Sequence, residues 1–225
     1  ICIPLLKWYD KSRRILPWRE LPTPYRVWVS EIMLQQTRVE AVKPYFERFM
    51  KALPDIGALA EAEEETLLKL WEGLGYYNRV RNLQKAAVQI QKAYGGRMPD
   101  TYEALLTLSG IGSYTAGAIA SIAFQRPVPA VDGNVLRVVA RLEQDGRCID
   151  DPKVALKEIM PEDRPGDFNQ AMMEIGACVC LPNGAPLCGE CPLADLCDSR
   201  RAGTQQDYPK RQAKKARQVE EKTIL

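Results

Sequence analysis

The chain has 225 residues, of which 46% are hydrophobic and 27% charged, so it is long enough for one or two globular domains with substantial cores. No apolar run approaches the roughly 18 residues that a membrane span needs, and the opening ICIPLLKWYDKSRR is too short and too soon polar for a secretory signal. We therefore expect a cytoplasmic protein, and the net charge of +2 is too small to indicate nucleic-acid binding by itself.

Apolar residues recur every three or four positions through most of the chain, which predicts an all-α fold. Gly and Pro separate the periodic segments, and no polar–apolar alternation is long enough to predict a strand. The predicted helical segments are 24–49, 54–74, 77–94, 101–108, 114–124, 133–144 and 151–160. From Arg200 onward the chain is polar and lysine-rich with little apolar periodicity, which indicates a linker or an exposed end.

The first of these segments carries a carboxylate, Glu31, three or four residues from Val27, Trp28 and Leu34. In a helix it shares their face, and burial there raises a carboxyl pKa and makes the group a proton donor near neutral pH. A glutamate at the helix edge with its carboxylate in water is the alternative, and it is the commoner situation for a single such residue. Because the chain contains no histidine, acid–base chemistry must fall on carboxylates, Lys, Tyr or Cys.

Residues 108–124, LSGIGSYTAGAIASIAF, predict two helices joined by a short Gly-x-Gly turn. Gly110 and Gly112 allow positive φ and a close approach to a ligand, and the free N–H groups at the start of the second helix, from Ser113, can face an anion. This pattern is typical of a helix-hairpin-helix, which binds a DNA phosphate without reading sequence. A plain corner between two helices is an equally good interpretation of this stretch alone.

Asp132 lies immediately ahead of the segment 133–144 and is predicted to cap that helix. Capping alone explains an isolated aspartate, but the positive potential of a helix N-terminus also keeps the carboxylate ionised. Together with Glu31 it would form a pair of carboxyl groups, one protonated and one negative. Such pairs cleave glycosidic bonds through a state that resembles an oxocarbenium ion.

Five of the seven cysteines lie between residues 178 and 197, which in a cytoplasmic chain indicates a metal site rather than disulfides. The spacing C-x7-C-x2-C-x5-C is formed by Cys180, Cys188, Cys191 and Cys197. Four thiolates fit either a structural zinc or a [4Fe-4S] cluster. Four-cysteine zinc sites usually present two C-x2-C pairs and only one is present here, so a cluster is the favoured interpretation, with Cys178 as a competing ligand.

Taken together, these stretches resemble the helix-hairpin-helix DNA glycosylase superfamily, and within it the MutY-type adenine DNA glycosylases. The resemblance extends from residue 6 to residue 197 and is carried by LPWR, VWVSEIMLQQTRVE, WEGLGYYNRVRNL, VDGNVLRV and FNQAMMEIGA. It implies a DNA repair enzyme that flips out adenine mispaired with 8-oxoguanine or guanine and hydrolyses its N-glycosidic bond. Little lyase activity is implied, because Tyr114 stands where relatives of the endonuclease III type carry a strand-cleaving lysine.

By the same resemblance Glu31 would protonate adenine at N7 and Asp132 would stabilise the sugar cation. Tyr114 and Asn134 would position Asp132 and the attacking water. The residues implied to line the adenine pocket or to lie near the estranged base are Trp18, Arg19, Gln170, Leu34 and Gln35. Those implied to enter the duplex are Gln36 and Tyr76, the latter as a wedge at the lesion partner, with Tyr77 as the alternative one position along.

The resemblance further implies two domains with the active site in the cleft between them. A six-helix domain with the hairpin would cover residues 16–126, and an iron–sulfur cluster domain would cover residues 1–15 and 127–200. Residues 201–225 would be a linker toward an absent C-terminal domain that inspects 8-oxoguanine. The chain would then be the catalytic half of such an enzyme, a monomer that acts on double-stranded DNA in a bacterial-type cytoplasm without a membrane partner.

One departure and two alternatives accompany this interpretation. Seven residues separate Cys180 from Cys188, one more than the family usually has between its first two cluster cysteines. A T:G mismatch glycosylase of the same superfamily would carry a similar set of motifs, since its members can also place tyrosine after the hairpin. A non-catalytic DNA-binding module that keeps the fold and the cluster as a scaffold is the second alternative.

Overall fold

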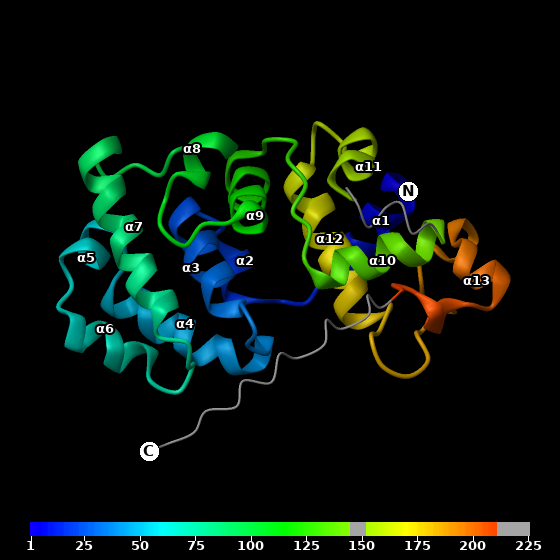
Figure 1. The fold of residues 1–225 in the computed structure, drawn as a ribbon, viewed down its shortest axis with the longest axis horizontal. Coiled ribbons are helices and arrows are strands. Elements are labelled where there is room, and N and C mark those ends of the chain that lie inside the picture. Colours follow the sequence, from blue (N-terminus) through cyan, green and yellow to red (C-terminus); the bar gives the residue numbers. More distant parts are fainter. Residues whose placement is uncertain (145–151, 211–225) are drawn as a thin grey trace, which may run out of the picture.

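The computed structural model of the chain describes residues 1–144 and 152–210 (Figure 1). Within these residues every regular element is helical, so the predicted all-α fold is confirmed. The elements are α1 (Cys2–Ser12), α2 (Pro17–Glu20), α3 (Pro24–Leu34), α4 (Val39–Ala52), α5 (Ile56–Glu61), α6 (Glu64–Trp71), α7 (Asn78–Tyr94), α8 (Tyr102–Leu106), α9 (Ser113–Phe124), α10 (Gly133–Glu143), α11 (Pro152–Ile159), α12 (Pro165–Cys178), η2 (Ala194–Leu196), α13 (Asp198–Ala202) and η3 (Gln205–Asp207). None of the helices in this described part is long and apolar enough to cross a bilayer. Most of the expected linker, residues 211–225, lies outside the described residues.

Two of the predicted helical segments are each divided into two helices. The segment 24–49 ends its first helix at Leu34 and begins its second at Val39, and the segment 54–74 divides at residues 62–63. At the first break Gln36 adopts a left-handed backbone with φ of 58°, through which a helix cannot continue. Side chains on both sides of each break face the same core, so apolar periodicity alone did not reveal them.

The buried side chains form two separate hydrophobic cores, and two separate segments of the chain contribute to the second core. The first core holds side chains between Leu16 and Ala130. The second combines side chains of α1, such as Leu5, with others between Val135 and Leu193. Figure 1 shows the two resulting lobes side by side, and α1 packs on α12 in the second lobe. The chain therefore passes between the lobes directly after α1 and again directly before α10.

The lobes meet where α12 packs against α9. Asn169 of α12 is buried, and its amide accepts a hydrogen bond from the backbone N–H of Ala130 at 3.1 Å. The same amide donates to the Ser121 hydroxyl at 2.7 Å and to the Val128 carbonyl at 2.9 Å. These bonds fix the returning segment before α10 and, with it, the position of the residue that caps α10.

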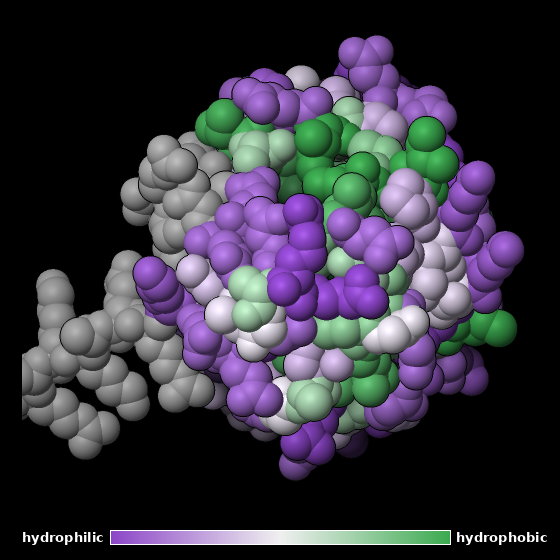
Figure 2. Space-filling model, turned by 90° about the vertical axis from the view of Figure 1, so that its right-hand side faces the viewer, coloured by the Kyte–Doolittle hydropathy of each residue, from purple (hydrophilic) through white to green (hydrophobic). Residues whose placement is uncertain are grey.

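The free end of the second lobe is mixed in polarity. Figure 2 shows hydrophilic side chains across the middle of this face and hydrophobic ones gathered in its upper half. Ile3 of α1 and Val154 of α11 are 70% and 55% exposed. Single exposed hydrophobic residues are common on protein surfaces, and the carboxyl groups of Glu31 and Asp132 lie where the two lobes meet.

Candidate active site

A cavity of about 530 Å³ lies between the lobes, within the range of about 300–1,000 Å³ that is typical of ligand pockets. Its walls come from α2, α3, the turn after α3, α9, the start of α10, and α12. Residues far apart in the sequence therefore meet on one surface. Those that the sequence had singled out and that line the cavity are Trp18, Arg19, Glu31, Leu34, Gln35, Gln36, Tyr114, Asp132, Asn134 and Gln170.

Glu31 lies on α3 with only 6% of its surface exposed, at the wall of the cavity. Its Oε2 accepts a hydrogen bond of 2.6 Å from the Tyr114 hydroxyl. Burial raises the pKa of Glu31 to about 7 from its usual 4.5; the hydrogen bond from Tyr114 opposes the rise, the nearby Asp132 adds to it, and Arg19 opposes it. A large fraction of Glu31 is therefore protonated at neutral pH, which is the state a general acid needs.

Asp132 caps α10, as its place in the sequence predicted, because its Oδ1 accepts from the Val135 backbone N–H at 2.8 Å. Its Oδ2 accepts from the Asn134 side-chain amide at 2.8 Å. Gly176 of α12 approaches so closely that a Cβ there would lie 2.6 Å from the Cβ of Asn134, which places α10 firmly against α12. Two hydrogen bonds at a helix N-terminus hold the Asp132 side chain in place, whereas burial favours the protonated form of Glu31.

The Tyr114 hydroxyl hydrogen-bonds to a different carboxyl group from the one that the resemblance implied. It donates to Glu31 and lies 3.5 Å from the Met173 sulfur, rather than contacting Asp132. Tyr114 is the second residue of α9, so the start of that helix places the ring opposite α3. Among the described side chains, Asn134 is the one that hydrogen-bonds to Asp132. In this structure the Tyr114 hydroxyl therefore contacts the carboxyl group of Glu31.

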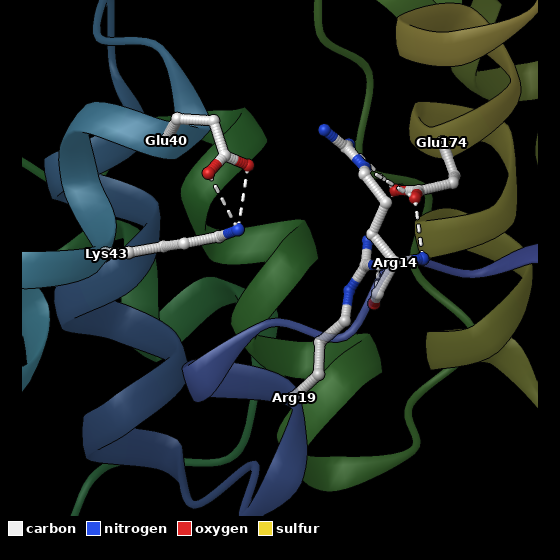
Figure 3. A network of polar contacts seen from close by, with 5 residues as sticks. All are labelled: Arg14, Arg19, Glu40, Lys43 and Glu174. Carbon is white, nitrogen blue, oxygen red and sulfur yellow. Dashed lines mark hydrogen bonds and ion pairs between the residues drawn. The ribbon is translucent and has the colours of Figure 1, made fainter.

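A buried ion network closes another wall of the cavity (Figure 3). Glu174 of α12 is 1% exposed and accepts from Arg14 Nε at 2.7 Å and from Arg19 Nη2 at 2.9 Å. Burial by itself raises the pKa of Glu174, but the hydrogen bonds from the two arginines outweigh it and hold the pKa at about 2. Figure 3 also shows an exposed pair on α4, in which Lys43 donates to Glu40 at 2.7 Å. The network thus ties the first crossing segment to α12.

Sequence reasoning missed Glu174 and Arg14, although a signal for the glutamate was present. Glu174 lies in FNQAMMEIGA among apolar residues, the same pattern that drew attention to Glu31. The resemblance assigns a role in this stretch to Gln170 alone. Arg14 carries no comparable signal, because an arginine in a polar stretch after a helix is ordinary.

The hairpin between α8 and α9 is present, with one difference from expectation. Gly110 has φ of 75°, and a Cβ there would lie 2.8 Å from the Asn82 Cβ, so this position requires glycine. Gly112 is extended, with φ of −90° and ψ of 179°, and is the N-cap of α9 without a side-chain cap bond. The expectation of positive φ at Gly112 is therefore wrong. Its surroundings are open, and neighbouring Ser113 is exposed, so the N–H groups of the first turn are accessible.

The two residues expected to enter a duplex lie in separate exposed turns of the first lobe. Gln36 follows α3 and borders the cavity. Tyr76 lies before α7, is 65% exposed and does not line the cavity. Neighbouring Tyr77 is 39% exposed and is the N-cap of α7. Of the two tyrosines, Tyr76 presents more of its ring to a partner.

A second, much smaller cavity lies in the second lobe and is lined by all four cysteines of the predicted cluster, Cys180, Cys188, Cys191 and Cys197. Burial raises the pKa of Cys191 to about 11. A backbone hydrogen bond opposes this rise, and the neighbouring thiols add to it. Arg141 also lines this cavity, and its Nη1 donates to the Cys180 sulfur at 3.3 Å. Within the described ranges, no three His, Cys, Asp or Glu side chains converge as the ligands of one metal ion would. Cys178 does not border this cavity.

Two helical lobes with a cavity between them and a glycine-containing hairpin between α8 and α9 indicate a helix-hairpin-helix protein. Residues 29–160 match the family model described as HhH-GPD superfamily base excision DNA repair protein, and the chain belongs to this family.

Curated relatives and solved structures agree with this assignment. A mouse protein named adenine DNA glycosylase is 47% identical over 211 residues, which cover 86% of this chain and 40% of the mouse protein. A relative of the same name from Buchnera aphidicola subsp. Acyrthosiphon pisum is 41% identical over 218 residues, covering 94% and 62%. The chain thus spans less than two thirds of the length of either relative.

Among solved structures, a thermostable thymine-DNA glycosylase superposes with a TM-score of 0.82 at 27% identity, covering 88% of this chain and 94% of that one. A trapped covalent intermediate of endonuclease III with DNA superposes with a TM-score of 0.75 at 25% identity, covering 88% and 93%.

Proposed function

We propose that the chain is the glycosylase half of an adenine-specific DNA repair enzyme that removes adenine mispaired with 8-oxoguanine or guanine. The observation that carries the proposal is that Glu31 and Asp132 line one cavity in different surroundings. Glu31 is buried and its pKa is raised, whereas Asp132 accepts a backbone hydrogen bond at the start of α10. Relatives that are 41% and 47% identical over most of this chain and bear the name adenine DNA glycosylase support the choice of base. The substrate is double-stranded DNA, on which the chain acts as a monomer.

In this mechanism Glu31 donates its proton to N7 of the extruded adenine. The bond between N9 and C1′ breaks, its electron pair leaves with the base, and positive charge develops on the sugar. The carboxylate of Asp132 stabilises that charge at short range in a cavity that excludes bulk water. Water then adds to C1′ and releases a proton to solvent, and Asn134 keeps the Asp132 carboxylate oriented throughout. Tyr114 positions the acid rather than the anion.

Other residues of the cavity hold the adenine base, and residues of the exposed turns contact the opened duplex. Trp18, Arg19 and Gln170 line the adenine pocket, with the guanidinium of Arg19 fixed by Glu174. Leu34 and Gln35 lie beside the base that adenine leaves behind. Gln36 and Tyr76 enter the duplex, and the N–H groups around Gly110, Gly112 and Ser113 bind a backbone phosphate.

We further infer the domain division and the cofactor. Residues 16–126 form the six-helix domain with the hairpin, residues 1–15 and 127–200 form the cluster domain, and residues 201–225 are the linker toward a further domain; the two separate cores support this division. Four cysteines around one small cavity, of which only one pair has the C-x2-C spacing, suit a [4Fe-4S] cluster better than zinc. Cys180, Cys188, Cys191 and Cys197 would hold the cluster, and their common ligand would cross-link the loop 180–197. Arg137 donates to the Cys180 carbonyl at 2.8 Å and to Asn134 at 2.9 Å, so the loop that bears the cysteines supports the site.

Single-turnover base release from matched duplexes that contain A:8-oxoguanine, A:G or T:G tests the function. We expect free adenine from the first two and no release from the third. Release of thymine without adenine would identify a T:G glycosylase, for which the similarity to the thymine-DNA glycosylase structure is the supporting observation. Binding without release from any of them would identify a non-catalytic module. Iron analysis with visible absorbance tests the cofactor, and colourless protein with zinc alone would contradict the cluster.

A further inference from the structure

Two exposed side chains of the first lobe, Gln36 and Tyr76, share an unusual backbone conformation. Both lie in the left-handed region, with φ of 58° and 48°, although neither is glycine. Gln36 follows the C-cap of α3, and the other two such residues of the described chain, Gln125 and Gln144, are themselves C-caps; this conformation is common at helix ends. Tyr76 belongs to no helix end, and a residue with a Cβ keeps this conformation there only where surrounding contacts over-determine it. The loop 72–77 must therefore be held by specific contacts, which it shares with loop 35–38.

One guanidinium, that of Arg79 in the first turn of α7, contacts both loops. Its Nη1 donates to the Gln35 carbonyl at 2.5 Å, and its Nη2 donates to the Gly75 carbonyl at 3.2 Å. These carbonyls belong to the residues immediately before Gln36 and Tyr76, so the guanidinium fixes the peptide plane from which each left-handed residue starts. Its further acceptors are the carbonyls of Ile32, Met33 and Leu74 and the hydroxyl of Thr37.

Two aromatic rings and no carboxylate surround the Arg79 guanidinium in the described structure, so its hydrogen bonds go to the loop carbonyls. The guanidinium lies 5.4 Å from the ring centroid of Trp71 and 5.5 Å from that of Tyr76. Trp71 is fully buried, and its indole N–H donates to the Gly75 carbonyl at 3.1 Å, so it anchors the same loop to the core. None of the ion pairs among the described residues includes Arg79.

We propose that Arg79 is a positioning residue that locks loops 35–38 and 72–77 into one rigid wedge, whose two edges are Gln36 and Tyr76, for opening a base pair of duplex DNA. This inference rests on the proposed function, in which these two side chains enter the duplex. Because Arg79 already holds both loops in one conformation, they lose less conformational entropy when Gln36 and Tyr76 insert into DNA. Less of the binding free energy is then spent on ordering the loops. Arginine suits the task because its planar fork reaches acceptors on two sides, which a lysine ammonium cannot do.

The test compares Arg79→Met with Arg81→Met, a matched control on the same helix. Arg81 also carries one positive charge, but it pairs with Glu64 on the surface and contacts neither loop. Extrusion is measured by the fluorescence of 2-aminopurine on a 2′-fluorinated sugar, whose N-glycosidic bond resists cleavage, placed opposite guanine in a duplex that the protein saturates. We expect the native chain and Arg81→Met to raise the fluorescence equally, and Arg79→Met to raise it by at most about a tenth as much.

A second readout separates positioning from general stability. On a duplex in which adenine faces an abasic site there is little pairing to open, so Arg79→Met should release adenine within about twofold of the native rate, although it is at least about tenfold slower on A:G. An equal loss on both duplexes, or an equal loss in Arg81→Met, would overturn the inference. If Arg79→Met does not fold by circular dichroism, Arg79→Lys replaces it with the same expected pattern.

The fluorescence assay tests the role of Arg79 and the cleavage assay tests the proposed function, so each can be refuted without the other. A native chain that extrudes 2-aminopurine but releases no base would refute the proposed function and leave the role of Arg79 standing. A native chain that releases adenine, with Arg79→Met raising the fluorescence as much as the native chain does, would refute the role of Arg79 alone. No rise with the native chain would mean that there is no extrusion for Arg79 to support, which also refutes it.

Discussion

Replacing Glu31 with glutamine should make the protein much less active and, at alkaline pH, more stable. The amide keeps the shape of the side chain and can still accept the hydrogen bond from Tyr114. It cannot supply the acid proton, so base release should fall by about 10²- to 10⁴-fold, the usual contribution of a general acid. It also cannot ionise, which removes the free-energy cost of placing a negative charge in this buried position.

The size of the stability gain follows from the pKa of Glu31, which is about 7 in the folded chain and 4.5 for an ordinary glutamate. A carboxyl whose pKa is raised on folding favours the folded state while it is protonated, and this contribution is lost as the pH rises from 4.5 through 7. At about 1.4 kcal/mol for each tenfold change, the loss is about 3 kcal/mol at pH 8 and less than about 1 kcal/mol at pH 5. Glutamine does not titrate, so the variant should be more stable than the native chain by these amounts.

Urea unfolding at the two pH values measures the stability, and single-turnover base release measures the activity. Glu40→Gln is the matched control, because Glu40 is 76% exposed and its carboxylate is solvated. It should change neither quantity. Equal stability of Glu31→Gln and the native chain at pH 8, or base release at the native rate, would refute the reasoning.

Three further predictions concern the cavity walls. Tyr114→Phe removes a hydrogen bond that lowers the pKa of Glu31, so the alkaline decline of the excision rate should move up by about one pH unit; a decline at the same or a lower pH would contradict the contact. Asp132→Asn keeps a residue that can cap α10 but removes the charge, so excision should fall at least about 100-fold while the thermal midpoint changes little; an active, stable variant would exclude Asp132 from the chemistry. Glu174→Gln leaves two guanidinium groups without their anion and should cost about 3 kcal/mol in urea unfolding at pH 7. Because the pKa of Glu174 is depressed to about 2, that cost should shrink as the pH falls below 4.5, and a constant cost would contradict the ion network.

The parts of the fold that follow from local pattern were predictable from the sequence. Helical periodicity predicted the all-α class, and the caps at Asp132 and the glycine at Gly110 follow from backbone requirements that only a few residue types meet. The burial of Glu31 was predictable because its apolar neighbours share one helix face.

What the sequence did not reveal depends on contacts between distant segments. The break after Leu34 is stabilised by Arg79, which lies more than forty residues further along the chain. The direction of the Tyr114 hydroxyl depends on how α9 faces α3, and periodicity says nothing about that angle. The partners of Glu174 come from the other end of the chain, so their pairing becomes visible only once α12 is packed against the first crossing segment.

The second lobe is assembled from two ends of the chain, and this sets the order in which the protein can be built. The first core draws on one continuous stretch and can close as soon as that stretch has been synthesised. Helix α1 is made before all of it, yet its apolar face has to wait for α12. Removing residues 1–12 would therefore expose the apolar side chains of the second core that α1 covers, such as those of α12.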